Sequence, residues 1–154
     1  MSRWNISHIV YYSQHGQNRI LEFDPGNVTI ITGASRTGKT YIIETIDYCL
    51  CSSSIDLSNL IKKKVSFVGI KLVKDNTELL IAREVSQKSS SSSKMFIEIG
   101  NSVNIPDSVD GLKGSINESQ ARTLLAERFG LINFKDYEEY AATYSRCNFF
   151  KNLR

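Results

Sequence analysis

The stretch Gly33-Ala34-Ser35-Arg36-Thr37-Gly38-Lys39-Thr40 carries the strongest pattern in this 154-residue chain. Two glycines separated by four residues, followed directly by Lys and Thr, have the spacing of a phosphate-binding loop. In such a loop the backbone N–H groups point inward and surround phosphate oxygens. The helix that follows adds the positive end of its dipole. The sequence therefore predicts a nucleotide-binding site made of Gly33, Ala34, Ser35, Arg36, Thr37, Gly38, Lys39, Thr40 and Tyr41.

The side chains at the end of this loop predict how a nucleotide would be held. Lys39 has the position of the lysine that reaches the β- and γ-phosphates, and Thr40 that of the hydroxyl that binds Mg²⁺. We therefore expect ATP or GTP as the ligand, with Mg²⁺ as the metal ion. Arg36 has two open interpretations, a further cation beside the phosphates or a side chain that points to solvent.

The residues on either side of the loop fit this interpretation. Val28–Thr32 is a short run of β-branched residues without polar alternation, which predicts a central strand buried on both faces. Tyr41–Leu50 has the apolar spacing of a helix with one buried stripe, at Ile42, Ile43, Ile46, Cys49 and Leu50. The alternative is a glycine turn between a strand and a helix that binds no ligand.

The rest of the chain predicts strands first and helices last. β-branched and aromatic residues predict strands over 4–12, 19–23, 66–73, 78–83 and 95–99. Residues 74–77 read as a hairpin turn, and the serine-rich segment 86–94 predicts a flexible loop. Ser115 and Glu118 have the spacing of a capping box, which predicts a helix closed by Gly130.

These elements predict an α/β fold with a mixed sheet in one domain over residues 1–154. Residues 4–50 would supply strands, the phosphate loop and its helix, and residues 64–100 an antiparallel β-subdomain. Residues 115–146 would form C-terminal helices, the second of them over 135–146.

Composition is that of a globular protein, with 41% hydrophobic and 23% charged residues. No apolar run approaches the roughly 18 residues of a membrane span, and the N-terminus lacks a secretion signal, so we expect a cytoplasmic protein without membrane contact. Cys49, Cys51 and Cys147 lack metal-like spacing and predict free thiols. The net charge is only +3, and the basic run Lys62–Lys64 is either a solvated face or a contact to phosphate backbone.

The helix after the loop also resembles one group of P-loop proteins. Residues 38–50 resemble the G-K-S-N-x-x-E-A-I-x-x-x-L stretch in the ABC-type heads of SMC, RecF and RecN proteins and the related double-strand-break-repair ATPase. Ile20-Leu-Glu-Phe23 is similar to their second N-terminal strand, and the resemblance covers residues 4–85. The shared positions in the helix are Gly38, Lys39, Thr40, Glu44, Ile46 and Leu50.

This resemblance implies the ATP-binding N-terminal lobe of an ATPase that acts in DNA repair, chromosome maintenance or phage defence. It also implies a lid glutamine, for which Gln87 and Gln120 are candidates, and a nucleotide contact near residues 14–19. Ser35 and Arg36 depart from the Asn-Gly pair of such loops. An apolar run followed by Asp-Glu and a Ser-Gly-Gly signature are both missing from the sequence.

The missing motifs imply a truncated lobe that hydrolyses ATP poorly alone, because something must orient the attacking water. A C-terminal ATPase lobe or a second head would complete it, and DNA is a further possible partner. Two alternatives stay open, a self-contained small P-loop kinase or NTPase and a non-catalytic interaction module. Against the kinase, the chain after the loop is β-rich and has no cluster of lid arginines, with Arg122 and Arg128 as the only candidates in the later helix.

Overall fold

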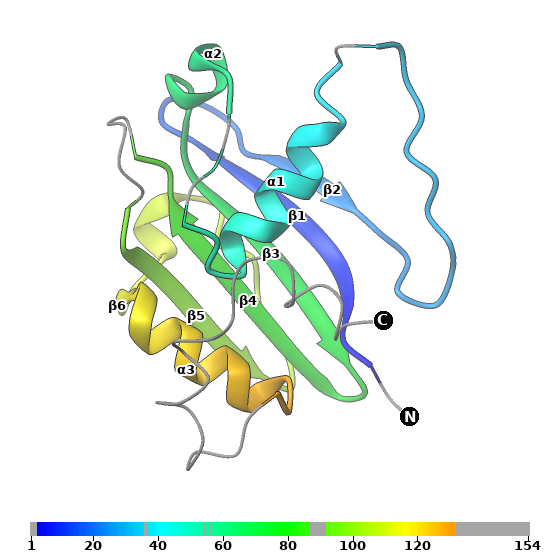
Figure 1. The fold of residues 1–154 in the computed structure, drawn as a ribbon, viewed down its shortest axis with the longest axis vertical. Coiled ribbons are helices and arrows are strands. Elements are labelled where there is room, and N and C mark those ends of the chain that lie inside the picture. The colour runs from blue at the N-terminus through cyan, green and yellow to red at the C-terminus, as the bar shows by residue number, and fades with distance from the viewer. Residues whose placement is uncertain (1–2, 36, 54, 56, 87–91, 132–154) are drawn as a thin grey trace.

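A computed structural model describes residues 3–35, 37–53, 55, 57–86 and 92–131 (Figure 1). Its centre is a six-stranded sheet in the order β2-β1-β3-β4-β5-β6, in which every pair of neighbours is antiparallel. The strands are β1 (Asn5–Ser13), β2 (Arg19–Glu22), β3 (Val65–Lys74), β4 (Thr77–Glu84), β5 (Lys94–Gly100) and β6 (Ile116–Asn117). The helices are α1 (Thr40–Cys49), α2 (Asn59–Lys62) and α3 (Glu118–Arg128), with a 3-10 turn, η1, at Val109–Gly111.

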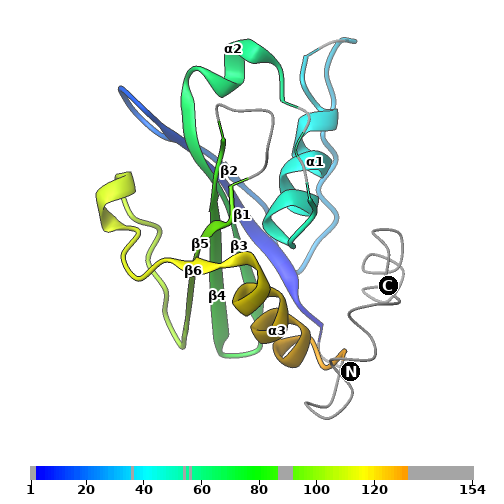
Figure 2. The same ribbon diagram turned by 60° about the vertical axis from the view of Figure 1, so that its left-hand side comes forward.

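The two faces of the sheet are covered differently, as the edge-on view in Figure 2 shows. Helices α1 and α3 lie on one face, over a core that includes Ile9, Ile70 and Ile81. Residues 101–113 cross the opposite face, where Val103 packs against Val10 and its neighbours. Ile9 and Val10 are adjacent and both fully buried, because successive residues of a strand point to opposite faces. Residues 101–113 therefore also supply core residues, although they form no strand.

The hairpin of β3 and β4 follows the sequence prediction closely. Lys74 pairs with Thr77 across a two-residue turn, and Asp75 takes a positive φ of 52° there. Asp and Asn tolerate this backbone conformation better than other non-glycine residues, which makes Asp75-Asn76 a suitable hairpin turn. The predicted segments 66–73 and 78–83 lie within the two strands.

The prediction of a buried central strand at Val28–Thr32 is wrong. These residues form no strand, and Val28 and Ile30 are 89% and 78% exposed. Figure 1 shows the segment as part of a long connection that runs outside the sheet between β2 and α1. A buried parallel strand needs a neighbour along each edge, and no strand of the described residues lies beside this segment. The predicted mixed sheet is wrong for the same reason, since the observed sheet is antiparallel throughout.

The two ends of α3 can be compared with the helix that the sequence predicts. The helix begins two residues later than the Ser115–Glu118 pair predicts, because Asn117 is the N-cap. Asn117 Oδ1 accepts a hydrogen bond from Gln120 N at 2.9 Å, and Gln120 Oε1 accepts one from Asn117 N at 3.2 Å. At the other end Gly130 has a φ of 68° and closes the helix as predicted. The predicted second helix over 135–146 and Cys147 lie outside the described residues.

Helix α1 matches the predicted range to within one residue at each end. Its buried side includes Thr45, Tyr48 and Cys49. Ile43, predicted to be on the buried stripe, is 64% exposed instead. None of the helices in the described part of the chain is long and apolar enough to span a membrane.

The exposed and buried isoleucines give a direct test of this core. We expect Ile81→Ala to lower the free energy of unfolding by about 2–5 kcal/mol, because Ile81 is fully buried. Ile30→Ala should change the free energy by no more than about 0.5 kcal/mol, because its side chain is largely in water. Urea denaturation followed by circular dichroism measures both, and a similar loss in the two variants would contradict the exposed position of Ile30.

Candidate functional site

The predicted site residues that the structure describes lie in the loop between Thr32 and α1 and in the first turn of α1. Gly33 has a φ of 157° and Gly38 a φ of 86°, and a side chain at Gly38 would be strained. The loop enters α1 directly, with Tyr41 N donating to Gly38 O at 3.0 Å. Ala34, Ser35, Thr37 and Thr40 are exposed, whereas Arg36 lies outside the described residues. The loop is thus open to solvent at the N-terminal end of a helix.

The ammonium group of Lys39 folds back onto this loop. Its Nζ donates to Gly33 O at 2.7 Å and to Ala34 O at 2.6 Å, and it also contacts Thr37 Oγ1 at 3.3 Å. Thr37 Oγ1 in turn donates to Ala34 O at 2.8 Å. These contacts hold the cation against two carbonyl oxygens and one hydroxyl group of the loop. A cation at the N-terminus of a helix is an arrangement that attracts an anion.

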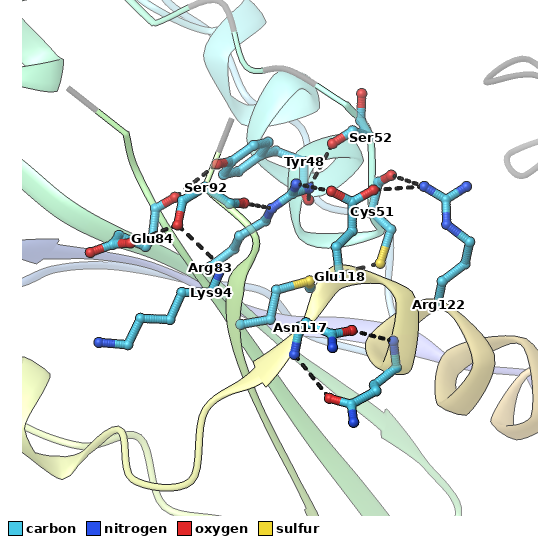
Figure 3. Close-up of polar contacts among 12 residues, drawn as sticks. Tyr48, Cys51, Ser52, Arg83, Glu84, Ser92, Lys94, Asn117, Glu118 and Arg122 are labelled. Atoms are coloured by element: carbon cyan, nitrogen blue, oxygen red, sulfur yellow. Dashed lines mark hydrogen bonds and ion pairs between the residues drawn. The ribbon is translucent and has the colours of Figure 1, made fainter. Parts of the chain in front are cut away.

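The far end of α1 is held by Arg83, a residue to which the sequence reasoning gave no role (Figure 3). Arg83 is fully buried, and its Nη1 donates to Tyr48 O at 3.0 Å and to Ser52 O at 2.6 Å. Its Nη2 forms an ion pair with Glu118 Oε2 at 2.6 Å. One signal in the sequence pointed to it, because Arg83 ends the apolar run Leu79–Ala82 of a buried strand.

Several other candidates lie away from the loop. Gln120 caps α3, so its side chain is engaged at that helix and not at residues 33–40. Arg122 bonds to Glu118 and to Cys51 O, which is beside the C-terminal end of α1. The turn at residues 14–18, predicted to contact nucleotide, lies on the other side of α2 from the loop in Figures 1 and 2. Gln87 is outside the described residues.

The two cysteines at the C-terminal end of α1 and just beyond it have the character of inert core residues. Cys49 and Cys51 are buried free thiols, as predicted. Burial raises the pKa of the Cys49 thiol well above its usual range and raises the pKa of Cys51 to about 11, while Arg83 opposes both shifts. Because the thiolate is the reactive form, neither side chain suits catalysis at neutral pH. Within the described residues, no group of His, Cys, Asp and Glu is arranged to hold a metal ion.

Comparison with known families gives one match of the whole described fold. A family model described as an AAA domain matches residues 5–139, which include every strand, the loop and all three helices. The chain matches no curated protein and no solved structure in the corresponding searches.

The buried thiols predict slow chemical modification. In a Cys147→Ser protein, we expect a thiolate-specific reagent to modify Cys51 far more slowly in the native than in the unfolded state. Its rate should rise about tenfold for each pH unit between pH 8 and 10, because this range lies below the raised pKa of about 11. Mass spectrometry of timed samples measures the rates. A plateau below pH 9 would contradict the raised pKa.

Proposed function

Because the chain belongs to the AAA-domain family, we propose that it binds ATP together with Mg²⁺ through residues 33–41. The family match supplies the general class, a nucleotide-binding, ATPase-like domain. The observation that carries the choice of site is the position of Lys39, whose ammonium contacts the carbonyls of Gly33 and Ala34 at the N-terminal end of α1. A phosphate chain offers the negative charge that this cation and the helix N-terminus both favour.

Binding would exchange one set of contacts of Lys39 for another. The ammonium now donates to the carbonyls of Gly33 and Ala34, and in the bound state it would donate to the β- and γ-phosphates instead. Charged oxygens are stronger acceptors than neutral carbonyls, which favours the exchange. The glycines at 33 and 38 let backbone N–H groups approach the phosphates closely.

The metal ion fits the same end of the helix. Thr40 is the first residue of α1 and is exposed, so its hydroxyl is available as a single protein ligand. Mg²⁺ commonly takes one or two ligands from the protein and completes its shell with phosphate oxygens and water. The ion would neutralise phosphate charge, while Lys39 and the loop backbone orient the phosphate chain.

The finer part of the proposal is that this is the N-terminal lobe of an SMC-like ATPase that a second lobe or a second head completes. The resemblance of residues 38–50 to ABC-type heads supports it. Exposed apolar side chains support it too, since six of the seven large ones in the described residues lie between positions 20 and 43, at Ile20, Leu21, Val28, Ile30, Ile31 and Ile43. Exposed apolar side chains that a partner covers would no longer be in contact with water, which favours such an interface.

In this proposal, a strand of the partner pairs with Val28–Thr32. The segment is β-branched, leads directly into the loop and has no strand beside it in the described residues. A strand paired there would bury Val28 and Ile30 and give the loop a fixed base. A water-orienting carboxylate absent from this sequence would come with it, so the chain alone should bind ATP and hydrolyse it poorly.

The proposed cellular role of the ATPase rests on the same resemblance to ABC-type heads. We place it in DNA repair, chromosome maintenance or phage defence, with DNA as a partner. Lys63 and Lys64 are exposed cations next to the turn of β1 and β2, where Gln14 N donates to Lys64 O at 2.9 Å. Cations on such a surface favour phosphate backbone without selecting a sequence.

Nucleotide titration tests the binding site. We expect saturable binding of a fluorescent ATP analogue with Mg²⁺ by the wild-type chain, and binding about tenfold to a hundredfold weaker in Lys39→Ala. The loss follows from removing hydrogen bonds to a charged ligand, each worth about 1.5–3 kcal/mol. Lys113→Ala is the matched control, because Lys113 is an exposed lysine next to Leu112, which packs on the face of the sheet opposite α1. It should bind as the wild type does.

The same samples separate the two parts of the proposal. Absence of saturable binding in the wild type would refute the ATP site. Binding with brisk phosphate release by the chain alone would refute the incomplete lobe and leave the ATP site standing.

The exposed apolar segment Val28–Thr32 predicts self-association of the isolated chain. Light scattering at high protein concentration should show self-association, because Val28, Ile30 and Ile43 leave apolar surface in water. Ile30→Ser should reduce it, whereas Lys113→Ser should not, since the latter changes no apolar surface. A wild-type chain that stays monomeric throughout would contradict an interface at this segment.

A further inference from the structure

The side chain of Arg83 lies at the junction of three parts of the chain. Besides Tyr48 O, Ser52 O and Glu118, its Nε donates to Ser92 O at 3.1 Å, and its guanidinium stacks 4.1 Å from the centre of the Tyr48 ring. Figure 3 shows these partners converging on the guanidinium from α1, the chain before β5 and α3. A fully buried cation is tolerated only when it is paired in this way.

The ion pair of Arg83 and Glu118 matches the dipoles of α1 and α3. Arg83 meets the carbonyls at the C-terminal end of α1, where a helix dipole favours positive charge. Glu118 is the first residue of α3, where the dipole favours negative charge. Arg122 strengthens the same link, with Nη2 donating to Glu118 Oε1 at 2.8 Å and to Cys51 O at 3.0 Å. The end of α1 and the start of α3 are therefore held by one connected set of charges.

The candidate nucleotide loop lies at the other end of α1. The helix is ten residues long, or roughly 15 Å, which is short enough to move as a rigid unit. A ligand at its N-terminus would draw Lys39 away from the carbonyls of Gly33 and Ala34 and change how α1 is held there. Any shift of α1 along its axis changes the distance from its C-terminal carbonyls to Arg83. A packed junction of this kind has discrete arrangements and does not deform smoothly.

We propose that Arg83 and Glu118 couple the loop at residues 33–40 to α3, so that binding of a nucleoside triphosphate at one end of α1 stabilises α3 at the other. The proposal rests on the ATP site proposed above. Arg83 and Glu118 are positioning residues in it, because both lie at the opposite end of α1 from the ligand. By linkage, the contact that transmits binding to α3 also contributes to nucleotide affinity, by the same factor.

The single tryptophan of the chain reports on α3 directly. Trp4 Nε1 donates to Arg128 O at 3.3 Å, and the Trp4 ring lies edge-on to Phe129 with centroids 5.9 Å apart. A change at the C-terminal end of α3 should therefore alter the fluorescence of Trp4. Amide hydrogen exchange over residues 118–128 gives a second and independent measure.

The test compares Glu118→Gln with the wild type, using a non-hydrolysable ATP analogue with Mg²⁺. Glutamine keeps the size of the side chain and an acceptor oxygen while it removes the charge, and circular dichroism checks that the variant is folded. Saturating analogue should slow exchange in α3 about fivefold or more in the wild type and change Trp4 fluorescence. In Glu118→Gln the analogue should bind about fivefold more weakly and, at saturation, leave both readouts unchanged.

Glu78→Gln is the matched control. Glu78 pairs with Lys71 at 2.8 Å, and its side chain is 26% exposed, close to the 25% of Glu118. Glu78 Oε2 accepts a hydrogen bond from Val103 N, which belongs to the core on the opposite face of the sheet from α1 and α3. This variant should behave as the wild type in both readouts.

The outcomes distinguish this inference from the proposed function. Saturable binding that leaves α3 unchanged in the wild type would overturn the coupling and keep the ATP site. A full α3 response in saturated Glu118→Gln would overturn the role of this contact. No saturable binding by the wild type would overturn the ATP site and the coupling with it.

Discussion

The buried guanidinium of Arg83 constrains the arrangement of both long helices on the sheet. Its charge is fully removed from water, so every donor must meet an acceptor, and those acceptors come from α1, Ser52, Ser92 and Glu118. Apolar packing alone would let α1 and α3 slide over Ile70 and Ile81, because the hydrophobic effect has no direction. Hydrogen bonds to one planar cation fix where the two helices end and begin.

Because Arg83 holds only one end of α1, the two ends of this helix differ in burial. The C-terminal end is held in the core by Tyr48 and Cys49, whereas the N-terminal end leads into a solvent-open loop stabilised by its own lysine. A binding site at the free end of an anchored helix is accessible, and it is attached to a rigid element. The uncovered segment Val28–Thr32 lies at that same end, which is where we propose that a second lobe meets the chain.

Local patterns in the sequence were reliable where a single short stretch determines the outcome. The turn at Asp75, the helix after Thr40 and the closure of α3 at Gly130 all depend on the backbone preferences of a few adjacent residues. The start of α3 was misplaced because Ser115 and Asn117 are both good caps, and only the fold selects between them. The strand at Val28–Thr32 was wrong for a different reason. Its β-branched residues indicate a preference for burial, but a strand also needs a neighbour.

The sequence by itself determined the spacing of Gly33, Gly38, Lys39 and Thr40, the helix that follows them and the apolar positions of β3 and β4. These follow from residue type and separation along the chain. Only the tertiary structure decided that Lys39 folds onto the carbonyls of its own loop and that Arg83 meets Glu118, 35 residues away. Contacts between distant residues depend on how the sheet and helices pack, and that packing is settled by shape and burial over the whole molecule, which no local pattern records.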